Sequence, residues 1–481
     1  MHGLRNADLF RQQACIDGAW ISAEATFPVI NPATGEVLGQ VPDLGRGETA
    51  RAIAAAQAAW PAWRERLAQE RAMLLRRWQA LMLEHADDLA RLITLEQGKP
   101  LAEARGEILY AAGFLEWFAE EAKRVYGRVI PSPWQGRRIL TLKQPMGVAA
   151  LITPWNFPAA MLTRKAGAAL AAGCTVVAKP ASKTPYTALA LAYLAQEAGF
   201  PAGVVNVVTG QAEVIGGELT SNPLVRKVSF TGSTETGKRL MAACAGTLKS
   251  VSLELGGNAP FIVFDDADLG AAVAGALASK YRNAGQTCVC ANRLMAQAGI
   301  HDEFVERLAA AVSELQVGNG LDAGVTQGPM VSEAAVAKVE AQVREAVGQG
   351  ARVVCGGQRH ALGGAFFQPT VLAEVTPQMR VCREETFGPL APVIRFTDEA
   401  EAVRLANATE YGLAAYFYAR DMARVWRVSE ALEYGMVGVN AGVISTEVAP
   451  FGGVKQSGLG REGGAEGIEA YLEDKYLCLA E

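Results

Sequence analysis

Two kinds of hydrophobic spacing alternate along the chain and divide it into regions. Residues 48–97 carry apolar side chains at helical spacing, and a second helical pattern runs from about Leu101 to Tyr126. From residue 146 onward, short apolar runs alternate with helical stretches. The expected strands are 148–152, 175–178, 204–208 and 227–230, and the expected helices are 158–171 and 185–198. This alternation predicts an α/β fold with a parallel sheet, helices on both faces and ligands at the carboxyl ends of the strands.

Three further patterns set the expected domain boundaries. Residues 14–42 read as short strands, 125–144 read as a hairpin, and a second α/β stretch begins at 259–264 and runs to about residue 455. We therefore expect two Rossmann-type domains: a dinucleotide-binding domain of residues 1–124 and 145–256, and a catalytic domain of residues 257–456. The boundary falls between Glu254 and Cys288, which would place these two residues across an interdomain cleft.

Composition and charge narrow the class of protein. With 481 residues, the chain is expected to form two or three domains. Half of the residues are apolar and the net charge is −5 without a basic run, which argues against a nucleic-acid partner. No segment reaches the roughly 18 apolar residues of a membrane span, and the N-terminus lacks the apolar core of a signal peptide. A cytoplasmic protein is expected.

The cysteines and histidines indicate neither a disulfide framework nor a metal site. Eight cysteines are scattered over the whole chain, and the four histidines lie at no ligand spacing from any of them. We therefore expect no bound metal. The lack of a histidine near a cysteine also weakens a cysteine-protease interpretation, since such enzymes need a base for the thiol.

Two reactive side chains lie in unusual contexts. Glu254 precedes Gly256-Gly257 behind an apolar run, and Cys288 follows a glycine-containing turn 34 residues later. A cysteine that attacks carbon and a glutamate that activates water would form a covalent enzyme. The alternative is a small buried cysteine and a glutamate in a turn, and the two contexts alone do not decide between these interpretations.

Two glycine-rich stretches resemble nucleotide-binding motifs. Residues 232–239 follow an expected strand, open a helix and match the P-loop pattern except at Arg239, where a P-loop needs Ser or Thr to bind Mg²⁺. A phosphoryl-transfer enzyme, with Asp265 and Asp266 holding the metal, is therefore the alternative from another reaction class. Residues 458–463 match G-x-G-x-x-G, but no strand precedes them, so we interpret them as a glycine-rich loop.

Six motifs in order give the chain a resemblance to the aldehyde dehydrogenase superfamily, from about Ile16 to the C-terminus. Within it, the chain is most similar to the succinate-semialdehyde dehydrogenases. The motifs are Thr153-Pro154-Trp155-Asn156-Phe157-Pro158, Lys179-Pro180-Ala181-Ser182, Phe230-Thr231-Gly232-Ser233, Leu253-Glu254-Leu255-Gly256-Gly257, Gly285-Gln286-Thr287-Cys288 and Glu384-Glu385-Thr386-Phe387-Gly388-Pro389. The resemblance implies oxidation of an aldehyde to an acid through a cysteine thiohemiacetal and thioester.

The resemblance also implies a role for individual residues. Cys288 would be the nucleophile, Asn156 and the Cys288 backbone N–H would hold the oxyanion, and Glu254 would activate water. Whether Glu254 also helps to deprotonate the thiol is left open. The cofactor would be held by Trp155, Asn156, Lys179, Ser182, Gly232, Ser233, Gly237, Leu255, Glu385 and Phe387. The turn at 232–237 suits a pyrophosphate because a helix N-terminus offers free N–H groups and a positive dipole end.

Position 182 predicts the cofactor. NAD-preferring relatives commonly carry Glu there, which binds the ribose hydroxyls and repels a 2′-phosphate. Ser182 removes that repulsion, Lys179 supplies a cation and Lys183 offers a second. We therefore predict NADP as the preferred cofactor, with NAD as an alternative.

Two arginines and a serine predict the substrate. Arg164, Arg282 and Ser445 match positions that bind the substrate carboxylate in succinate-semialdehyde dehydrogenases, and a guanidinium suits bidentate carboxylate binding. Succinate semialdehyde is the expected substrate. Glutarate semialdehyde stays open, because one methylene is worth only about 1–3 kcal/mol of discrimination.

Two expectations concern regulation and assembly. Cys290 lies two residues from Cys288, so the pair could form a reversible disulfide that inactivates the enzyme under oxidation, or Cys290 could be a small buried side chain. The resemblance further implies that residues 125–144 and 457–481 form a small β oligomerisation element. A homo-oligomer, either a dimer or a tetramer, is expected.

Overall fold

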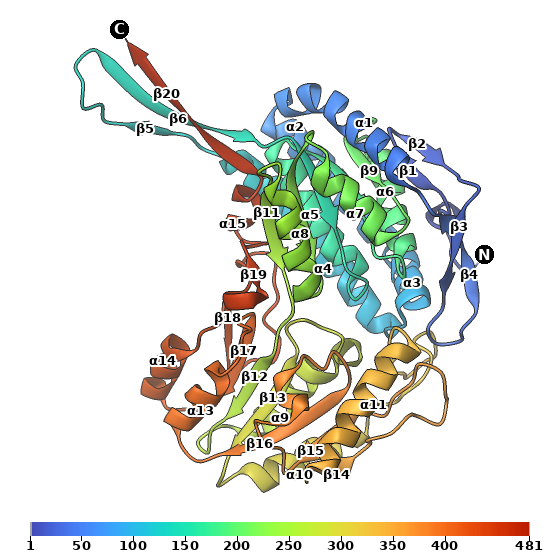
Figure 1. Cartoon of the computed structure of the whole chain (residues 1–481), viewed down its shortest axis with the longest axis vertical. Helices are drawn as coiled ribbons and strands as arrows, with labels where there is room; N and C mark the ends of the chain where they lie inside the picture. Colours follow the sequence, from blue (N-terminus) through green and yellow to red (C-terminus); the bar gives the residue numbers. More distant parts are fainter. Residues whose placement is uncertain (1, 481) are drawn as a thin grey trace.

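The computed structural model describes residues 2–480. Two open β-sheets, each flanked by helices, lie one above the other in Figure 1. A smaller three-stranded sheet projects from the upper part, away from both. The architecture agrees with the predicted α/β class. No helix within residues 2–480 combines the length and apolar character needed to cross a bilayer.

The first sheet has eight strands in the order β19-β11-β10-β7-β8-β9-β1-β2. Its five central strands, from β11 to β9, run parallel, and the outer strands pair antiparallel. The strands are β1 (Ala14–Ile16), β2 (Ala19–Ile21), β7 (Val148–Ile152), β8 (Thr175–Lys179), β9 (Val205–Val207), β10 (Val225–Thr231), β11 (Ser250–Glu254) and β19 (Gly458–Leu459).

Helices bury both faces of this sheet. The helices are α1 (Arg46–Glu65), α2 (Ala68–Glu84), α3 (Ala86–Gln97), α4 (Leu101–Glu121), α5 (Pro158–Ala172), α6 (Pro185–Ala198), α7 (Ala212–Ser221) and α8 (Thr234–Ala245), with short 3₁₀ turns η1 (Ala7–Leu9) and η2 (Ala122–Arg124). Along β7, Ala149 and Leu151 pack in the core with α2 to α6, whereas Val148 and Ala150 pack in the core with α1, α7 and α8. Adjacent residues of a strand point to opposite faces, so a strand buried on both faces reads as a continuous apolar run.

The long helical pattern at 48–97 is not one helix but three. The chain is extended at Arg66 and Leu67 between α1 and α2, and it turns at His85 between α2 and α3. The apolar spacing continues across these breaks because each helix buries a face against the sheet: α2 and α3 in one core, and α1 mainly in the core on the opposite face. Periodicity reports the buried face and does not report where the backbone turns.

The second sheet has seven strands in the order β14-β15-β16-β13-β12-β17-β18, all parallel except the edge strand β14. The strands are β12 (Ala259–Val263), β13 (Ala291–Gln297), β14 (Arg352–Cys355), β15 (Thr370–Ala373), β16 (Leu390–Phe396), β17 (Ala414–Tyr418) and β18 (Met436–Val439). The helices are α9 (Leu269–Tyr281), η3 (Arg282–Gly285), α10 (His301–Ser313), α11 (Glu333–Gly348), α12 (Arg380–Arg383), α13 (Glu399–Asn407), α14 (Met422–Ala431), η4 (Lys455–Ser457) and α15 (Glu466–Glu469).

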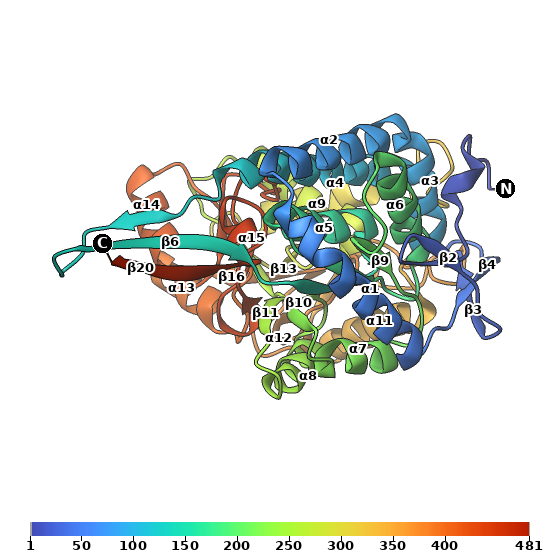
Figure 2. The ribbon, with the colours of Figure 1, turned by 90° about the horizontal axis from the view of Figure 1, so that it is seen from above.

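The projecting sheet joins the predicted hairpin to the C-terminal strand. It has the order β20-β6-β5, from β5 (Arg128–Ile130), β6 (Arg137–Pro145) and β20 (Leu472–Ala480). Strands β6 and β20 pair antiparallel from Leu472↔Pro145 to Ala480↔Arg137, and Figure 2 shows the pair extending away from the rest of the molecule. A separate two-stranded sheet contains β3 (Thr26–Ile30) and β4 (Val37–Pro42).

One part of the predicted oligomerisation element lies elsewhere. The sequence predicts that residues 457–471 belong to the same element as the projecting sheet. In the structure, β19 instead pairs with β11 at the edge of the eight-stranded sheet, and α15 contacts α5. Gly458 makes this approach possible, since it has φ +148° and a Cβ there would lie 2.1 Å from the Leu253 carbonyl oxygen.

Candidate active site

The carboxyl ends of four neighbouring parallel strands bring predicted site residues to one edge of the first sheet. Asn156 follows β7, Lys179 ends β8, Gly232 follows β10 and Glu254 ends β11. Parallel strands end at the same edge, so residues almost a hundred positions apart share one region.

Cys288 lies between two cavities and lines both. One cavity, of about 310 Å³, is lined by Glu103, Gly106, Glu107, Tyr110, Phe157, Met161, Arg164, Arg282, Thr287, Cys288, Val289, Ser445 and Phe451. We call it the arginine cavity. The other, of about 260 Å³, is lined by Pro154, Trp155, Asn156, Met161, Thr231, Gly232, Ser233, Leu255, Gly256, Cys288, Lys338, Glu385 and Phe387. We call it the glycine-turn cavity. Cys288 and Met161 are the residues that the two linings share.

A strained turn presents the thiol. Asn283, Ala284 and Gly285 all have left-handed backbone angles, with φ of 52°, 54° and 71°. This conformation costs about 1–2 kcal/mol for each non-glycine residue, so other contacts must hold it. Gln97 Nε2 donates to Asn283 Oδ1 at 2.9 Å, and Gln286 Nε2 donates to the Asn283 carbonyl at 3.1 Å. The sequence indicated a glycine turn here but not three left-handed residues in a row.

Gly256 and Gly257 allow three functional segments to meet. A Cβ on Gly257 would lie 2.5 Å from the Cys288 carbonyl oxygen, and one on Gly256 would lie 3.0 Å from Glu385 Oε2. The Gly257 N–H donates to Glu385 Oε1 at 3.0 Å. Burial raises the pKa of Glu385 to about 7, although this N–H and Lys338 favour its charged form. The pair of glycines therefore gives close backbone approach as well as a turn.

The Cys288 thiol is predominantly protonated at neutral pH in the free protein. Burial raises its pKa to about 12; the Arg164 cation opposes this shift, and the acidic groups of Glu385 and Glu254 add to it. The thiolate is the nucleophilic form. A partner must therefore remove the proton, or a new positive charge must lower the thiol pKa, before the sulfur attacks.

Glu254 is buried behind the cavities and lines neither of them. Its side chain is 2% exposed, and neither carboxylate oxygen has a hydrogen-bond partner. Burial, and then the nearby Glu462 carboxylate, raise the pKa of Glu254 well above its usual value. A carboxyl group with two unpartnered oxygens close to a thiol can hold or accept a proton.

Arg164 lies in a buried charge cluster. Arg164 and Lys165 both contact Glu462, and the Arg164 Nε to Glu462 Oε2 distance is 2.5 Å. Although this distance is short, neither Nε nor Nη1 of Arg164 forms an aligned hydrogen bond. Nη2 of Arg164 donates to Met161 Sδ at 3.1 Å. The guanidinium carbon lies 4.2 Å from the centre of the Phe451 ring. Arg164 therefore has unused donors at the arginine cavity.

The other predicted substrate residues reach the same cavity. Arg282 lies over the Phe157 ring at 5.5 Å, and Ser445 is part of the lining. Glu103 also lines the cavity, and its carboxylate accepts the Asn283 N–H at 2.8 Å. The structure thus brings Arg164, Arg282 and Ser445 together with Cys288, as the predicted roles require.

Asn156 follows β7 and lines the glycine-turn cavity. Its Nδ2 donates to the Gln286 carbonyl at 3.0 Å, which leaves a second amide hydrogen, and its Oδ1 has no partner. The Asn156 carbonyl accepts from Lys99 Nζ at 2.7 Å and from Asn283 Nδ2 at 3.0 Å. This arrangement ties the Asn156 backbone to the strained turn.

Sequence reasoning missed Lys99 and Glu107, which position several of these groups. Lys99 Nζ lies 2.6 Å from Glu107 Oε2, and both side chains are fully buried. Glu107 Oε1 accepts the N–H groups of Ala159 and Ala160 at the N-terminus of α5, the helix that carries Arg164. The contacts join α4 to α5 across about fifty residues, so no local motif could have revealed them.

The glycine-turn cavity has the features of a dinucleotide site. The Trp155 and Phe387 rings meet edge to face at 5.5 Å, and Ser233 caps α8 by accepting the Thr236 N–H. A Cβ on Gly232 would lie 2.3 Å from the Phe230 ring, and one on Gly237 would lie 2.4 Å from Leu255. Gly237 therefore serves helix packing and does not line the cavity.

Lys179 and Ser182 lie beyond this cavity. Lys179 Nζ donates to Ser182 Oγ at 3.3 Å, and Ser182 Oγ donates to the Gly210 carbonyl at 3.3 Å. Burial lowers the pKa of Lys179 to about 8, while Asp43 raises it. Ser182 and Lys183 line a separate cavity of about 680 Å³.

Cys290 lies away from both cavities. It is buried, its thiol donates to the Gly285 carbonyl at 3.3 Å, and Lys280 Nζ lies 3.8 Å from its sulfur. A disulfide with Cys288 stays a prediction, and the structure has all eight cysteines free.

The P-loop interpretation fails on geometry. Lys238 is exposed and donates to Gln456, and Arg239 is exposed as well. Asp265 and Asp266 follow β12 in the other sheet, where Arg424 pairs with both. Lys238 and the two aspartates therefore do not meet at the 232–237 turn as a P-loop requires.

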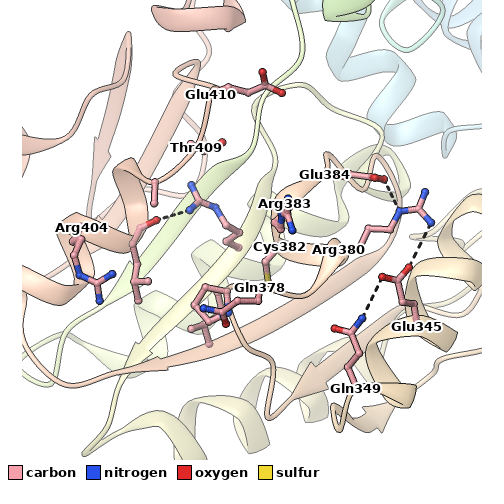
Figure 3. A pocket seen from close by; sticks show the side chains of 15 residues that line it. Glu345, Gln349, Gln378, Arg380, Cys382, Arg383, Glu384, Arg404, Thr409 and Glu410 are labelled. Atoms are coloured by element: carbon pink, nitrogen blue, oxygen red, sulfur yellow. Dashed lines mark hydrogen bonds and ion pairs between the residues drawn. The ribbon is translucent and has the colours of Figure 1, made fainter.

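A larger cavity of about 950 Å³ is lined by residues that include Cys382, Arg383 and Glu384 (Figure 3). Arg380 pairs there with both Glu345 and Glu384, and Arg293 donates to backbone carbonyls such as that of Leu405. It contains none of the predicted site residues. Volume alone therefore does not single out the cavities that contain the predicted site residues, which are smaller.

Comparison with known proteins places the chain in a family. A family model described as "Aldehyde dehydrogenase family" matches residues 20–477. A glutarate-semialdehyde dehydrogenase from Pseudomonas aeruginosa is 66% identical over 478 residues, 99% of each chain. Succinate-semialdehyde dehydrogenase (NADP(+)) GabD from Escherichia coli is 65% identical, again over 99% of each chain. A crystal structure of an NADP-dependent enzyme from E. coli matches with a TM-score of 0.99 at 65% identity, covering 99% of this chain and 100% of that one.

These matches run along almost the whole chain, and they confirm the resemblance that the six ordered motifs predicted. The chain belongs to the aldehyde dehydrogenase family.

Proposed function

We propose that this protein oxidises succinate semialdehyde to succinate with NADP as the preferred cofactor. The proposal rests on the position of Cys288, which lines both the arginine cavity and the glycine-turn cavity. A nucleophile in that position can hold an acidic aldehyde on one side while a dinucleotide lies on the other. The E. coli relative named for succinate semialdehyde and NADP supports this choice.

The residues of the glycine-turn cavity fit the cofactor. Gly232 lines the cavity beside the α8 N-terminus, where free N–H groups and the helix dipole favour a pyrophosphate. Trp155, Phe387 and Glu385 would hold the nicotinamide end, and Lys179 and Ser182 the adenosine ribose. When bound, NADP accepts the hydride released from the aldehyde carbon.

The first step forms a carbon–sulfur bond. The Cys288 sulfur attacks the aldehyde carbon as its proton leaves, and the carbonyl oxygen becomes an oxyanion. The free amide hydrogen of Asn156 and the Cys288 backbone N–H are proposed to hold that oxyanion. One such donor is worth about 3–4 kcal/mol in the transition state. Loss of hydride then leaves a thioester on Cys288.

Glu254 is proposed to complete the reaction. It takes a proton from a water molecule, the resulting hydroxide attacks the thioester carbon, and the carbon–sulfur bond breaks. Glu254 returns the proton to the departing sulfur, which releases the carboxylic acid and the free thiol. Because Glu254 lines neither cavity, the water must lie between its carboxylate and Cys288. The raised pKa of Glu254 means that more of it is ionised as the pH rises, so hydrolysis should accelerate with pH.

The arginine cavity is proposed to select the acidic aldehyde. Arg164 has unpartnered N–H groups, and Arg282 adds a second cation at the same cavity. Guanidinium groups suit bidentate carboxylate binding, and Ser445 offers a hydroxyl beside them. An aldehyde without a second charged group would leave these donors without an acceptor.

Glutarate semialdehyde is a second candidate substrate. The P. aeruginosa relative named for it is as similar to this chain as the E. coli relative. The two substrates differ by one methylene, worth about 1–3 kcal/mol, so kcat/KM for the two should differ by about 200-fold at most.

Assembly, domain organisation and location are also proposed. The projecting sheet exposes apolar side chains that a second copy would cover: Val129, Trp134, Leu142, Tyr476 and Leu479. We therefore propose a homodimer or homotetramer formed through the 125–144 hairpin and β20. The dinucleotide-binding and catalytic domains would meet at Cys288. A cytoplasmic location would keep its nucleophilic thiol reduced.

Initial rates of nicotinamide reduction test the proposal. They would be measured with succinate semialdehyde, glutarate semialdehyde and butanal, each with NADP and with NAD. Strong preference for the acids and for NADP is expected, and Cys288→Ala should abolish turnover. Activity on butanal alone would remove the carboxylate pocket, and turnover by Cys288→Ala would refute the covalent mechanism.

A further inference from the structure

We propose that Tyr110 is a further specificity-determining residue, whose hydroxyl donates a hydrogen bond to the anionic end group of the substrate. The inference rests on the proposed function, because it assumes that the arginine cavity holds that end group. Tyr110 adds a neutral hydrogen-bond donor from α4 to the two cations of this cavity, Arg164 from α5 and Arg282 from η3.

The position of the hydroxyl is the first observation. Tyr110 lines the arginine cavity together with Cys288. Its hydroxyl is buried and has no aligned hydrogen-bond partner. A buried hydroxyl without a partner is unfavourable by about 1–3 kcal/mol, so a phenylalanine would fill this place better if packing were the sole requirement. Because Tyr110, unlike the other tyrosines with an unpartnered buried hydroxyl, lines the arginine cavity, its hydroxyl can donate to a molecule that binds there.

The neighbours of the hydroxyl indicate the charge of that partner. Arg164 and Arg282 both act electrostatically on the Tyr110 hydroxyl, and Arg164 also lies close enough to donate toward its oxygen, which leaves the O–H itself free to donate. Nη1 of Arg164 has no aligned acceptor. Hydroxyl and guanidinium N–H groups that share one cavity, each without an acceptor, together suit an anion. A carboxylate offers two oxygens and about four lone-pair positions, enough for several donors at once.

The protonation and orientation of Tyr110 suit a donor. Burial raises the pKa of its phenol above the usual value, which outweighs the opposite effect of Arg164 and Arg282, so the O–H stays protonated at neutral pH. The ring meets Phe114 edge to face at 4.8 Å. Because Phe114 is fully buried on the same helix, this contact limits the directions in which the ring can point.

A matched pair of substitutions separates this role from packing. Tyr110→Phe removes one oxygen and keeps the ring. Tyr186→Phe makes the same change at another buried tyrosine with an unpartnered hydroxyl, which packs in the core of the first sheet and does not line the arginine cavity. The readout is kcat/KM for succinate semialdehyde and for butanal, with kcat and KM reported separately.

Tyr110→Phe should lower kcat/KM for succinate semialdehyde by about tenfold or more, the value of a hydrogen bond to a charged group. The loss should appear mainly as a higher KM. Butanal kinetics, and both substrates with Tyr186→Phe, should stay within about twofold of the wild type.

Two results would overturn the proposal. If Tyr110→Phe leaves kcat/KM for succinate semialdehyde unchanged, or lowers kcat/KM for succinate semialdehyde and butanal equally, the hydroxyl does not bind the anionic end group. If the wild type itself prefers butanal, the anion pocket fails and the role of Tyr110 fails with it. The first result leaves the proposed substrate class standing and the second removes it, so the two failures are distinguishable.

Discussion

The buried cluster of Glu462, Arg164 and Lys165 gives a quantitative prediction about stability. One carboxylate faces two cations, and the three side chains are between 1% and 5% exposed or fully buried. Glu462→Gln removes the carboxylate that contacts both cations, and of the acidic groups that act on both of them Glu254 remains. Lys165→Met removes one cation and leaves Arg164 and Glu462 as a one-to-one pair. The two substitutions should therefore have unequal effects, although each breaks one ion pair of the same cluster.

The magnitudes follow from which group can become neutral. Burial lowers the pKa of Lys165, so it can lose its proton when Glu462 is removed. Arg164 cannot, because a guanidinium is not deprotonated in proteins. Glu462→Gln therefore leaves Arg164 charged without the carboxylate that contacts it, which should lower the free energy of unfolding by about 3–5 kcal/mol. Lys165→Met should lower it by about 1 kcal/mol, since volume is preserved and the remaining charges cancel.

Denaturant unfolding, followed by intrinsic fluorescence, measures both variants, with Glu430→Gln on the exposed surface of α14 as the control. Burial alone would raise the pKa of Glu462, but Lys165 and Arg164 hold it below the usual 4.5. Its stabilising effect is therefore present above about pH 4.5 and is lost as the pH falls through the lower folded-state pKa. The difference between wild type and Glu462→Gln should shrink in acid. Equal destabilisation by the two variants at pH 7 would refute the reasoning.

Other substitutions test the thiol, its turn and the cofactor end of the site. Because burial raises the pKa of Cys288 to about 12, its alkylation by iodoacetamide should increase about tenfold per pH unit up to at least about pH 9, and a plateau near neutral pH would contradict this. Glu254→Gln should lower turnover by about 100-fold or more, because it removes the base for the water; alkylation of Cys288 that slows in parallel would make Glu254 the base for the thiol as well. Gly285→Ala should lower both turnover and the melting temperature, because the new Cβ would lie 2.2 Å from the Gly388 carbonyl oxygen at φ +71°, whereas Gly299→Ala has nothing within 4 Å and should change neither. Ser182→Glu should shift the ratio of NADP to NAD activity toward NAD, measured as kcat/KM with each cofactor, and an unchanged ratio would remove Ser182 from the cofactor assignment.

Much of the architecture could be predicted from local patterns. The βαβ alternation after residue 146 predicted the parallel sheet, because strands buried on both faces read as continuous apolar runs between helices. The hairpin at 125–144 was also expected, and the structure has β5 and β6 there. The six short motifs identified the family, since each is a run of neighbouring residues whose spacing is visible in the chain.

The tertiary structure decided which distant groups meet. Nothing near Tyr110, Lys99 or Glu107 in the sequence marks them, yet α4 packs along α5 and brings them to Cys288 and Arg164. Glu462 belongs to the 458–463 run, which the sequence alone indicates to be a glycine-rich loop. In the structure this run begins with β19, which pairs with β11, and Glu462 then contacts Arg164 and Lys165.

The physical reason is the range of each interaction. Backbone conformation and the burial of one face depend on a few adjacent residues, so the sequence by itself determined the elements and the reactive side chains. The charge on a buried group depends on every neighbour within several ångströms, whatever its place in the chain. The protonation of Cys288 and Glu254, and the unused donors of the arginine cavity, were therefore decided only when the helices and strands packed together.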